Sequence, residues 1–187
     1  MDFLIQLDGD ILLFIQEHIR KDWMESFWIF ITSLGDTGWF WLAVSALMLI
    51  PKKTRTIGIT AILAVAIGAL LTNVTLKTLV ARIRPYEVVE GLRLLIEKPH
   101  DYSFPSGHTC ASFAAALVYY RMLPKKWGIA AVVLASLIAF SRMYLGVHYP
   151  SDILAGLAIG TFAAWAAVCI VAYIGRKSKP DSAAKLE

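Results

Sequence analysis

Three short polar patches in an otherwise apolar chain carry the residue types that phosphoryl transfer needs. The patches are Lys77-x6-Arg84-Pro85, Pro105-Ser106-Gly107-His108 and Ser141-Arg142-x5-His148-x3-Asp152. Together they supply three cations, two histidines, one carboxylate and a helix start that contains glycine. Phosphoryl transfer depends mainly on positioning and on neutralising the charge of the phosphate oxygens. The patches therefore predict a site that holds and transfers a phosphoryl group.

The first patch places two cations and a proline at the end of an apolar run. Lys77 and Arg84 are seven residues apart, about two helical turns, so both side chains can share one side if the helix continues that far. Pro85 would then end the helix, because it has no backbone N–H to donate. The simpler alternative is that the cations extend to lipid headgroups at the end of a membrane span.

The second patch is typical of a helix start that binds an anion. Pro105 suits a first helical turn, and the free backbone N–H groups of that turn attract phosphate. Gly107 lets a phosphate oxygen approach the backbone closely, and His108 can donate a proton at the membrane edge. Taken alone, Pro-Ser-Gly is also a common loop and helix start.

The third patch combines an arginine in a membrane span with a histidine–aspartate pair. A guanidinium at membrane depth usually faces a cavity or a partner, and the planar fork of Arg142 suits phosphate oxygens. Asp152 follows His148 by four residues, so its carboxylate can accept the Nδ1–H and leave Nε2 free to attack. The alternative is a loop followed by a helix-capping aspartate. Headgroup anchors would not need this combination, so the three patches together favour a functional site.

Long apolar runs indicate that the patches belong to a membrane protein. The 187 residues are 58% hydrophobic and have a mean hydropathy of +0.62, more than a soluble domain of this size normally carries. Residues 56–76 and 153–174 contain no charge, and each run can cross about 30 Å of hydrocarbon. The net charge of +4 falls at segment ends rather than along one stripe, so it does not indicate nucleic-acid binding.

The pattern predicts an all-α integral membrane fold, a helical bundle in a single domain over residues 1–179. We expect membrane spans near residues 27–50, 56–76, 105–120, 127–147 and 153–174. Gly35-Asp36-Thr37-Gly38 interrupts the first span, so its outer part could be a separate surface helix. Residues 3–19 predict an amphipathic helix on the membrane surface. The alternative, a sixth span, would bury two aspartates near its centre. We expect residues 180–187 to be disordered.

Basic residues set the expected orientation. Clusters of Lys and Arg follow the first, third and fifth spans, and cytoplasmic loops carry the excess of such residues. The C-terminus is therefore expected in the cytoplasm, and the three patches at the outer face of the cell membrane. Cys110 and Cys169 lie near opposite ends of different spans, so no disulfide is expected. Gly156-x3-Gly160 could form a helix-packing face within the chain.

The patches resemble the three signature motifs of the type-2 phosphatidic acid phosphatase superfamily. The matched positions lie within residues 77–152 and are Lys77, Arg84 and Pro85; Pro105, Ser106, Gly107 and His108; and Ser141, Arg142, His148 and Asp152. The resemblance implies that His148 attacks phosphorus and forms a phosphohistidine, with Asp152 orienting it. It also implies that His108 protonates the leaving oxygen and then activates water.

The resemblance further implies a set of groups that stabilise the phosphate oxygens. These are Lys77, Arg84, Arg142, the Ser106 hydroxyl and the Gly107 N–H, with Pro85, Pro105 and Ser141 as structural positions of the motifs. Fixed cations of this kind can replace Mg²⁺. No further acid cluster suggests a metal site, so we expect neither a metal nor another cofactor.

The family includes phosphatases of undecaprenyl pyrophosphate, phosphatidylglycerophosphate, lipid A and glucose 6-phosphate, and also vanadium haloperoxidases. A site at the membrane face favours a lipid phosphate whose tail stays in the bilayer. Because the site is expected to face outwards, we favour undecaprenyl pyrophosphate; phosphatidic acid, phosphatidylglycerophosphate and lipid A phosphates stay open. The loop of residues 86–103 is expected to influence the choice. A haloperoxidase and a non-catalytic lipid-binding protein are the remaining alternatives, and the sequence does not indicate an oligomeric state.

Overall fold

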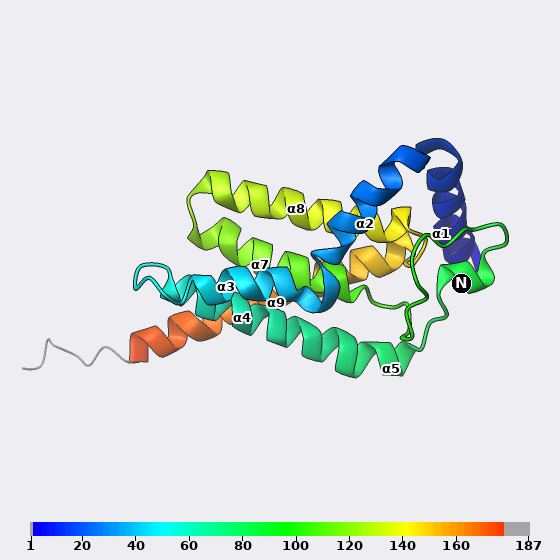
Figure 1. Cartoon of the computed structure of the whole chain (residues 1–187). Coiled ribbons are helices and arrows are strands. Elements are labelled where there is room, and N and C mark those ends of the chain that lie inside the picture. The colour runs from blue at the N-terminus through cyan, green and yellow to red at the C-terminus, as the bar shows by residue number, and fades with distance from the viewer. Residues whose placement is uncertain (1, 178–187) are drawn as a thin grey trace, which may run out of the picture.

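A computed structural model describes residues 2–177, and within that range the chain forms helices and no strand. In chain order the α-helices are α1 (Asp2–Phe14), α2 (Glu25–Ser33), α3 (Trp39–Leu47), α4 (Arg55–Ala69), α5 (Lys77–Val80), α6 (Pro85–Val88), α7 (Gly107–Met122), α8 (Lys125–Tyr144) and α9 (Pro150–Lys177). The long helices lie roughly side by side in an elongated bundle (Figure 1). The all-α class is confirmed, and the prediction for residues 180–187 lies outside the described residues.

Within the described range, three helical segments are long and apolar enough to cross a membrane, namely Arg55–Val88, Lys125–Tyr144 and Pro150–Lys177. A fourth span is possible where Asp22–Ser33 and Asp36–Leu47 meet at a bend of 41°, which is the predicted interruption. The predicted third span, now α7, has only 16 residues, fewer than the roughly 20 that a span normally needs. The membrane class holds, and the number of five spans stays a prediction.

The short helix α7 is the centre of the bundle rather than one of its outer members. It packs against α4, α8 and α9 and is largely buried. A Cβ added to Gly156 would lie 2.6 Å from the Ser106 carbonyl oxygen, and one on Gly160 would lie 2.6 Å from that of Cys110. The Gly156-x3-Gly160 face therefore packs inside the chain, as predicted. This close approach brings the start of α9 against the start of α7, so that the second and third motifs meet.

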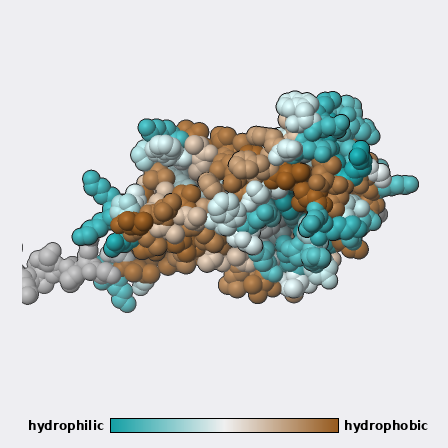
Figure 2. Space-filling view, viewed as in Figure 1, coloured by the Kyte–Doolittle hydropathy of each residue, from teal (hydrophilic) through white to brown (hydrophobic). Residues whose placement is uncertain are grey.

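The three motifs gather at one end of the bundle. That end holds the start of α7, the end of α8, the start of α9 and the loop after α6, with α1 lying across it (Figure 1). The connections that carry the basic clusters, between α3 and α4 and between α7 and α8, lie at the opposite end. Figure 2 shows apolar surface along the middle of the bundle and polar surface gathered at the end near α1. The fold therefore places the motifs at the edge of an apolar belt.

Two helix boundaries differ from the prediction. The helix that carries Lys77 ends at Val80, because Ala81 adopts the left-handed conformation with a φ of +48°. Pro85 does not end that helix; it begins α6, where a missing N–H is tolerated because the first turn has no partner for it. Arg84 thus reaches the site through a turn of the chain and not along a shared helix face. Pro105 likewise precedes the residue that caps α7 and lies outside its first turn.

The N-terminal helix α1 lies across the end of the bundle, at a large angle to the other helices (Figure 1). Leu12 is buried against Leu92 and Tyr149, and the carboxylate of Asp8 binds Arg82 at 2.8 Å. Within the described range, α1 is not among the segments that could cross a membrane. Its place on the membrane surface stays a prediction.

Candidate active site

Asp152 is buried and held in place by several hydrogen bonds, and it orients His148. Its side chain is fully buried, and its Oδ2 accepts from His148 Nδ1 at 3.2 Å, from the Tyr149 backbone N–H at 3.0 Å and from the Ser103 hydroxyl. The other oxygen, Oδ1, accepts from Arg82 Nη1 at 2.8 Å. An acceptor at Nδ1 holds the proton on that nitrogen and leaves a lone pair on Nε2. The predicted histidine–aspartate pair is therefore present with the geometry that a nucleophile requires.

The surroundings keep His148 neutral. The ring is 1% exposed, and burial lowers the pKa of His148 to about 3, although the hydrogen bond to Asp152 acts in the opposite direction. The nearby guanidiniums of Arg84 and Arg142 lower it further. Arg84 Nη1 lies 3.4 Å from His148 Nε2. The nitrogen that carries the lone pair thus faces a cation that can hold a phosphate oxygen.

Lys77 and Arg84 are brought together by a carboxylate that the motifs do not include. Asp101, in the loop before α7, binds Lys77 Nζ through Oδ2 and Arg84 Nη2 through Oδ1. Burial alone would raise the pKa of Asp101, but these two cations outweigh it and lower the pKa to about 2. Arg84 also donates to the Val147 carbonyl oxygen at 2.8 Å, which fixes its guanidinium. Two carboxylate oxygens therefore bind the two cations as two phosphate oxygens would.

Arg142 is buried with an unused donor. Its side chain is 3% exposed, and Nη1 donates to the Thr32 hydroxyl of α2 at 2.6 Å. Among the residues that the structure describes, its buried Nε has no hydrogen-bond partner. Buried polar atoms are nearly always paired, so this guanidinium nitrogen can donate to a phosphate oxygen. Arg142 is close enough to Arg84 for the two charges to repel, and an anion between them would remove that repulsion.

The start of α7 forms the third side of the site. Ser106 caps the helix, since its hydroxyl oxygen accepts from the Thr109 N–H at 3.4 Å and from the Thr109 hydroxyl at 3.0 Å. Both bonds use the oxygen, so the hydroxyl proton of Ser106 remains available. A Cβ on Gly107 would lie 2.9 Å from Asn73 Oδ1, so a side chain there would have to displace Asn73. The cap and the glycine thus expose the first backbone N–H groups, as the sequence predicts.

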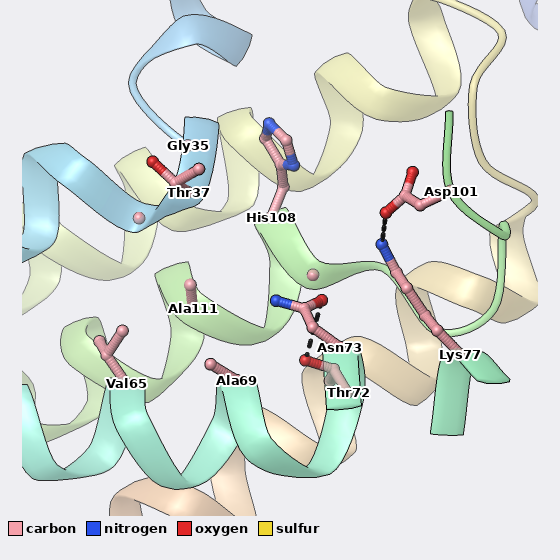
Figure 3. Close-up of a pocket in the computed structure, with 12 residues that line it drawn as sticks. Gly35, Thr37, Val65, Ala69, Thr72, Asn73, Lys77, Asp101, His108 and Ala111 are labelled. Atoms are coloured by element: carbon pink, nitrogen blue, oxygen red, sulfur yellow. Dashed lines mark hydrogen bonds and ion pairs between the residues drawn. The ribbon is translucent and has the colours of Figure 1, made fainter. Parts of the chain in front are cut away.

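A cavity of about 210 Å³ opens beside this helix start. Its polar wall includes His108, Lys77 and Asp101, and its apolar wall is formed by Val65, Ala69 and Ala111. Figure 3 shows Lys77 and Asp101 paired on one side of the cavity, and His108 above the start of α7. His108 Nε2 lies 2.8 Å from Asp36 Oδ1, in the predicted interruption of the first span. The cavity can therefore hold a phosphate beside Lys77 and His108 and an apolar group against the helices.

A second group of polar residues, centred on Arg82, stabilises the site by binding Asp152 and the start of α9. Arg82 donates to Asp152, to Asp8 and to the Ser151 hydroxyl, and its guanidinium lies 3.8 Å from the centroid of the Tyr149 ring. The Ser151 backbone N–H also donates to Asp8 at 3.0 Å. In this way α1 is tied to the start of α9. No spacing signal in the sequence marks Arg82, which looks like one more cation at the end of a span.

The structure thus brings the predicted residues into one site and adds five that the sequence did not identify. The additions are Thr32, Asp36, Arg82, Asp101 and Ser103. Of the predicted motif positions, Ser141 is buried and its hydroxyl donates to the Ile138 carbonyl oxygen at 2.6 Å, so its contact here is structural. Within residues 2–177 no group of three or more His, Cys, Asp or Glu side chains is arranged as metal ligands would be. The metal-independent mechanism stays a prediction.

A histidine held by a buried carboxylate, three converging cations and a membrane helix bundle define a membrane phosphatase that acts on lipids. The chain belongs to the PAP2 superfamily, whose sequence profile it matches over residues 57–176. It is 37% identical to an undecaprenyl-diphosphatase of Sulfolobus acidocaldarius over 142 residues, which cover 76% of this chain and 68% of that protein.

Two solved structures have the same fold. The crystal structure of Aquifex aeolicus LpxE superposes with a TM-score of 0.76 at 26% identity, covering 85% of this chain and 93% of that one. The crystal structure of a PAP2-type phosphatidylglycerolphosphate phosphatase from Bacillus subtilis gives a TM-score of 0.74 at 28% identity, covering 97% and 90%. The resemblance stated from the motifs is therefore confirmed.

Proposed function

We propose that the protein hydrolyses undecaprenyl pyrophosphate to undecaprenyl phosphate through a phosphohistidine on His148, without a metal ion. The observation that carries the mechanism is the pairing of His148 Nδ1 with Asp152, which leaves Nε2 unprotonated and 3.4 Å from Arg84 Nη1. The cavity has a polar wall and an apolar wall, which supports a substrate that joins a phosphate to a lipid tail. The name of the Sulfolobus relative supports the same substrate.

The reaction proceeds in two steps. The lone pair of His148 Nε2 attacks the terminal phosphorus, the bond from that phosphorus to the bridging oxygen breaks, and His108 gives the bridging oxygen a proton as undecaprenyl phosphate leaves. Water then attacks the phosphorus of the phosphohistidine while His108 takes back a proton, the bond between Nε2 and phosphorus breaks, and inorganic phosphate leaves. Asp152 keeps the histidine in the reactive tautomer throughout.

The cations and the helix start stabilise the negative charge of the transferring group. Lys77, Arg84 and Arg142 surround the equatorial oxygens, and the Ser106 hydroxyl and Gly107 N–H donate from the other side. The unpaired Nε of Arg142 supports its role, because a bound phosphate would supply the acceptor that this buried nitrogen lacks. Before it can bind, the substrate must displace Asp101, because the Asp101 carboxylate is paired with both Lys77 and Arg84.

The second candidate is a glycerolipid phosphatase with the same mechanism. The Bacillus subtilis structure is of a phosphatidylglycerolphosphate phosphatase, and the site chemistry does not distinguish the two leaving groups. The deciding experiment measures phosphate release by the purified protein in detergent with EDTA. Undecaprenyl pyrophosphate, phosphatidylglycerophosphate and phosphatidic acid are compared by kcat/KM, with His148→Ala as the blank. A preference for the pyrophosphate supports the proposal; preference for a glycerolipid favours the alternative, and loss of activity with EDTA contradicts the metal-free mechanism.

The orientation is proposed from the separation of charges in the fold. The site lies outside the cell and the basic end of the bundle lies in the cytoplasm, in accord with the preference of Lys and Arg for cytoplasmic loops. A test uses two single-cysteine variants at exposed positions, Glu97→Cys near the site and Lys126→Cys at the other end, in a chain without its native cysteines. A membrane-impermeant maleimide should label only Glu97→Cys in intact cells; labelling of only Lys126→Cys would reverse the orientation.

A further inference from the structure

The break between α2 and α3 bends a membrane span and also lines the cavity beside His108. The first part ends at Ser33, and Gly35 precedes the 3-10 turn Asp36–Gly38, with Thr37 and Gly38 at φ values of +49° and +71°. An ordinary residue such as threonine rarely adopts a positive φ. An unbroken helix over this stretch would not need a positive φ at Thr37. The unfavourable conformation therefore indicates that the break has a function. The turn forms one wall of the cavity beside His108, and Figure 3 shows Gly35 and Thr37 on that wall.

The turn holds the ring of His108 in two ways. Asp36 Oδ1 lies 2.8 Å from His108 Nε2. Gly35 lies so close that an added Cβ would be 2.7 Å from Cδ2 of the same ring. The carboxylate therefore fixes one nitrogen, while Gly35, which has no Cβ, lets the turn lie directly against the ring. Asp36 and His108 are 72 positions apart in the chain, so the contact exists only because the turn Asp36–Gly38 packs against α7.

The charges around His108 show why a carboxylate is needed there. Burial of the ring has the largest effect and lowers the pKa of His108, and the cations Arg142 on α8 and Lys77 on α5 lower it further, so all three disfavour a protonated imidazole. Asp36 is the acid that acts in the opposite direction. A general acid must carry a proton before it can donate one. In a site built from cations to hold phosphate, the histidine that protonates the leaving group depends on a nearby anion.

We propose that Asp36 is a positioning residue for His108, and that it makes His108 effective as the acid that protonates the leaving lipid oxygen. The inference rests on the proposed function of the site. Asp36 accepts the Nε2–H and stays ionised, and it favours the imidazolium form of His108, whose second, transferable proton lies on Nδ1. That proton moves to the leaving oxygen as its bond to phosphorus breaks, and Nδ1 then accepts a proton from the attacking water. Asp36 thereby serves the acid as Asp152 serves the nucleophile.

The test compares two leaving groups in Asp36→Asn. A diacylglycerol phosphate has an alkoxide leaving group that needs protonation, whereas a nitrophenyl phosphate with an alkyl tail releases a stabilised phenolate that does not. We expect kcat for the diacylglycerol phosphate to fall by about 10- to 100-fold, which is part of the roughly 10²- to 10⁴-fold that a general acid contributes. For the nitrophenyl ester we expect kcat to fall by less than about threefold, and KM should change little for either substrate.

Three controls make the result specific. Asp22→Asn removes the same charge from an exposed position at the start of the same bent helix, and it should leave both rates unchanged. Asp36→Glu keeps the carboxylate and should recover part of the lost rate on the diacylglycerol phosphate. Asp36→Asn added to His108→Ala should cost no further rate, because the residue acts through His108.

The outcomes separate the inference from the function on which it rests. Equal loss on both substrates, or no loss on either, in folded Asp36→Asn overturns the positioning role while the phosphatase function stands. If the wild-type protein releases phosphate from neither substrate, nor from undecaprenyl pyrophosphate, the proposed function fails and the role of Asp36 fails with it. A loss confined to the diacylglycerol phosphate, recovered by glutamate, establishes the role.

Discussion

Replacement of Asp101 by asparagine should make the protein bind phosphate-like anions more tightly. The carboxylate occupies Lys77 and Arg84 in the structure, so an incoming anion must first break two ion pairs. Because the pKa of Asp101 is lowered to about 2, the carboxylate stays charged throughout the working pH range, and acid cannot remove it without reaching pH values near 2. Asparagine keeps the shape and removes the charge.

The size of the effect follows from the exposure of the pair. Two unit charges about 4 Å apart attract by about 4 kcal/mol in a partly buried site and by about 1 kcal/mol in water. The Asp101 side chain is 53% exposed, so the lower value applies, and two pairs together give about 2 kcal/mol. Since each 1.4 kcal/mol is roughly tenfold in affinity, Asp101→Asn should lower the Kd for vanadate or phosphate by roughly 10- to 30-fold.

The assay is inhibition by vanadate together with thermal unfolding in detergent. Without an anion, Asp101→Asn should melt at a lower temperature than the wild type, because two buried cations lose their partner; added vanadate should restore more stability to the variant than to the wild type. Glu97→Gln removes an exposed charge from the same loop and serves as the matched control. An unchanged or weaker affinity in folded Asp101→Asn would refute the reasoning, since it would mean that the carboxylate orients the cations instead of occupying their site.

Three other substitutions test the remaining parts of the site. Arg142→Lys should lower kcat/KM by roughly 100-fold or more in the phosphate-release assay, because a lysine cannot replace the unpaired Nε and the bond to Thr32 together. Asp152→Asn should lower kcat by about 1,000-fold or more, since an amide can face Nδ1 with an N–H and favour the wrong tautomer; full activity would contradict the orienting role. His148→Asn should flatten the dependence of the melting temperature on pH. The pKa of His148 is lowered to about 3, below its unfolded value of about 6.5, so the wild type should lose up to about 1.4 kcal/mol of stability per pH unit between those values as the pH falls.

The local parts of the site could be predicted because their geometry depends on neighbours in the chain. His148 and Asp152 lie within one turn of the start of α9, so four-residue spacing was enough to pair them. The apolar runs behind α4 and α9 likewise predict helices by composition alone. The boundary at Pro85 failed for a local reason of another kind, since a left-handed residue at Ala81 ended the helix earlier. No propensity for that conformation is evident in an alanine.

The sequence by itself therefore determined the membrane class, the helical fold, the phosphatase motifs and the histidine–aspartate pair. Tertiary structure alone decided which further residues contact the motif side chains: Asp101 binds Lys77 and Arg84, Arg82 binds Asp152, and Asp36 binds His108. Arg82 and Asp152 are 70 positions apart, and polar side chains at such separation carry no periodic signal. They meet because glycines let α9 pack closely against α7 and because a break in an apolar span turns one carboxylate towards the site. Spacing along the chain reports neighbours within a helix, whereas contacts between helices depend on how their faces pack.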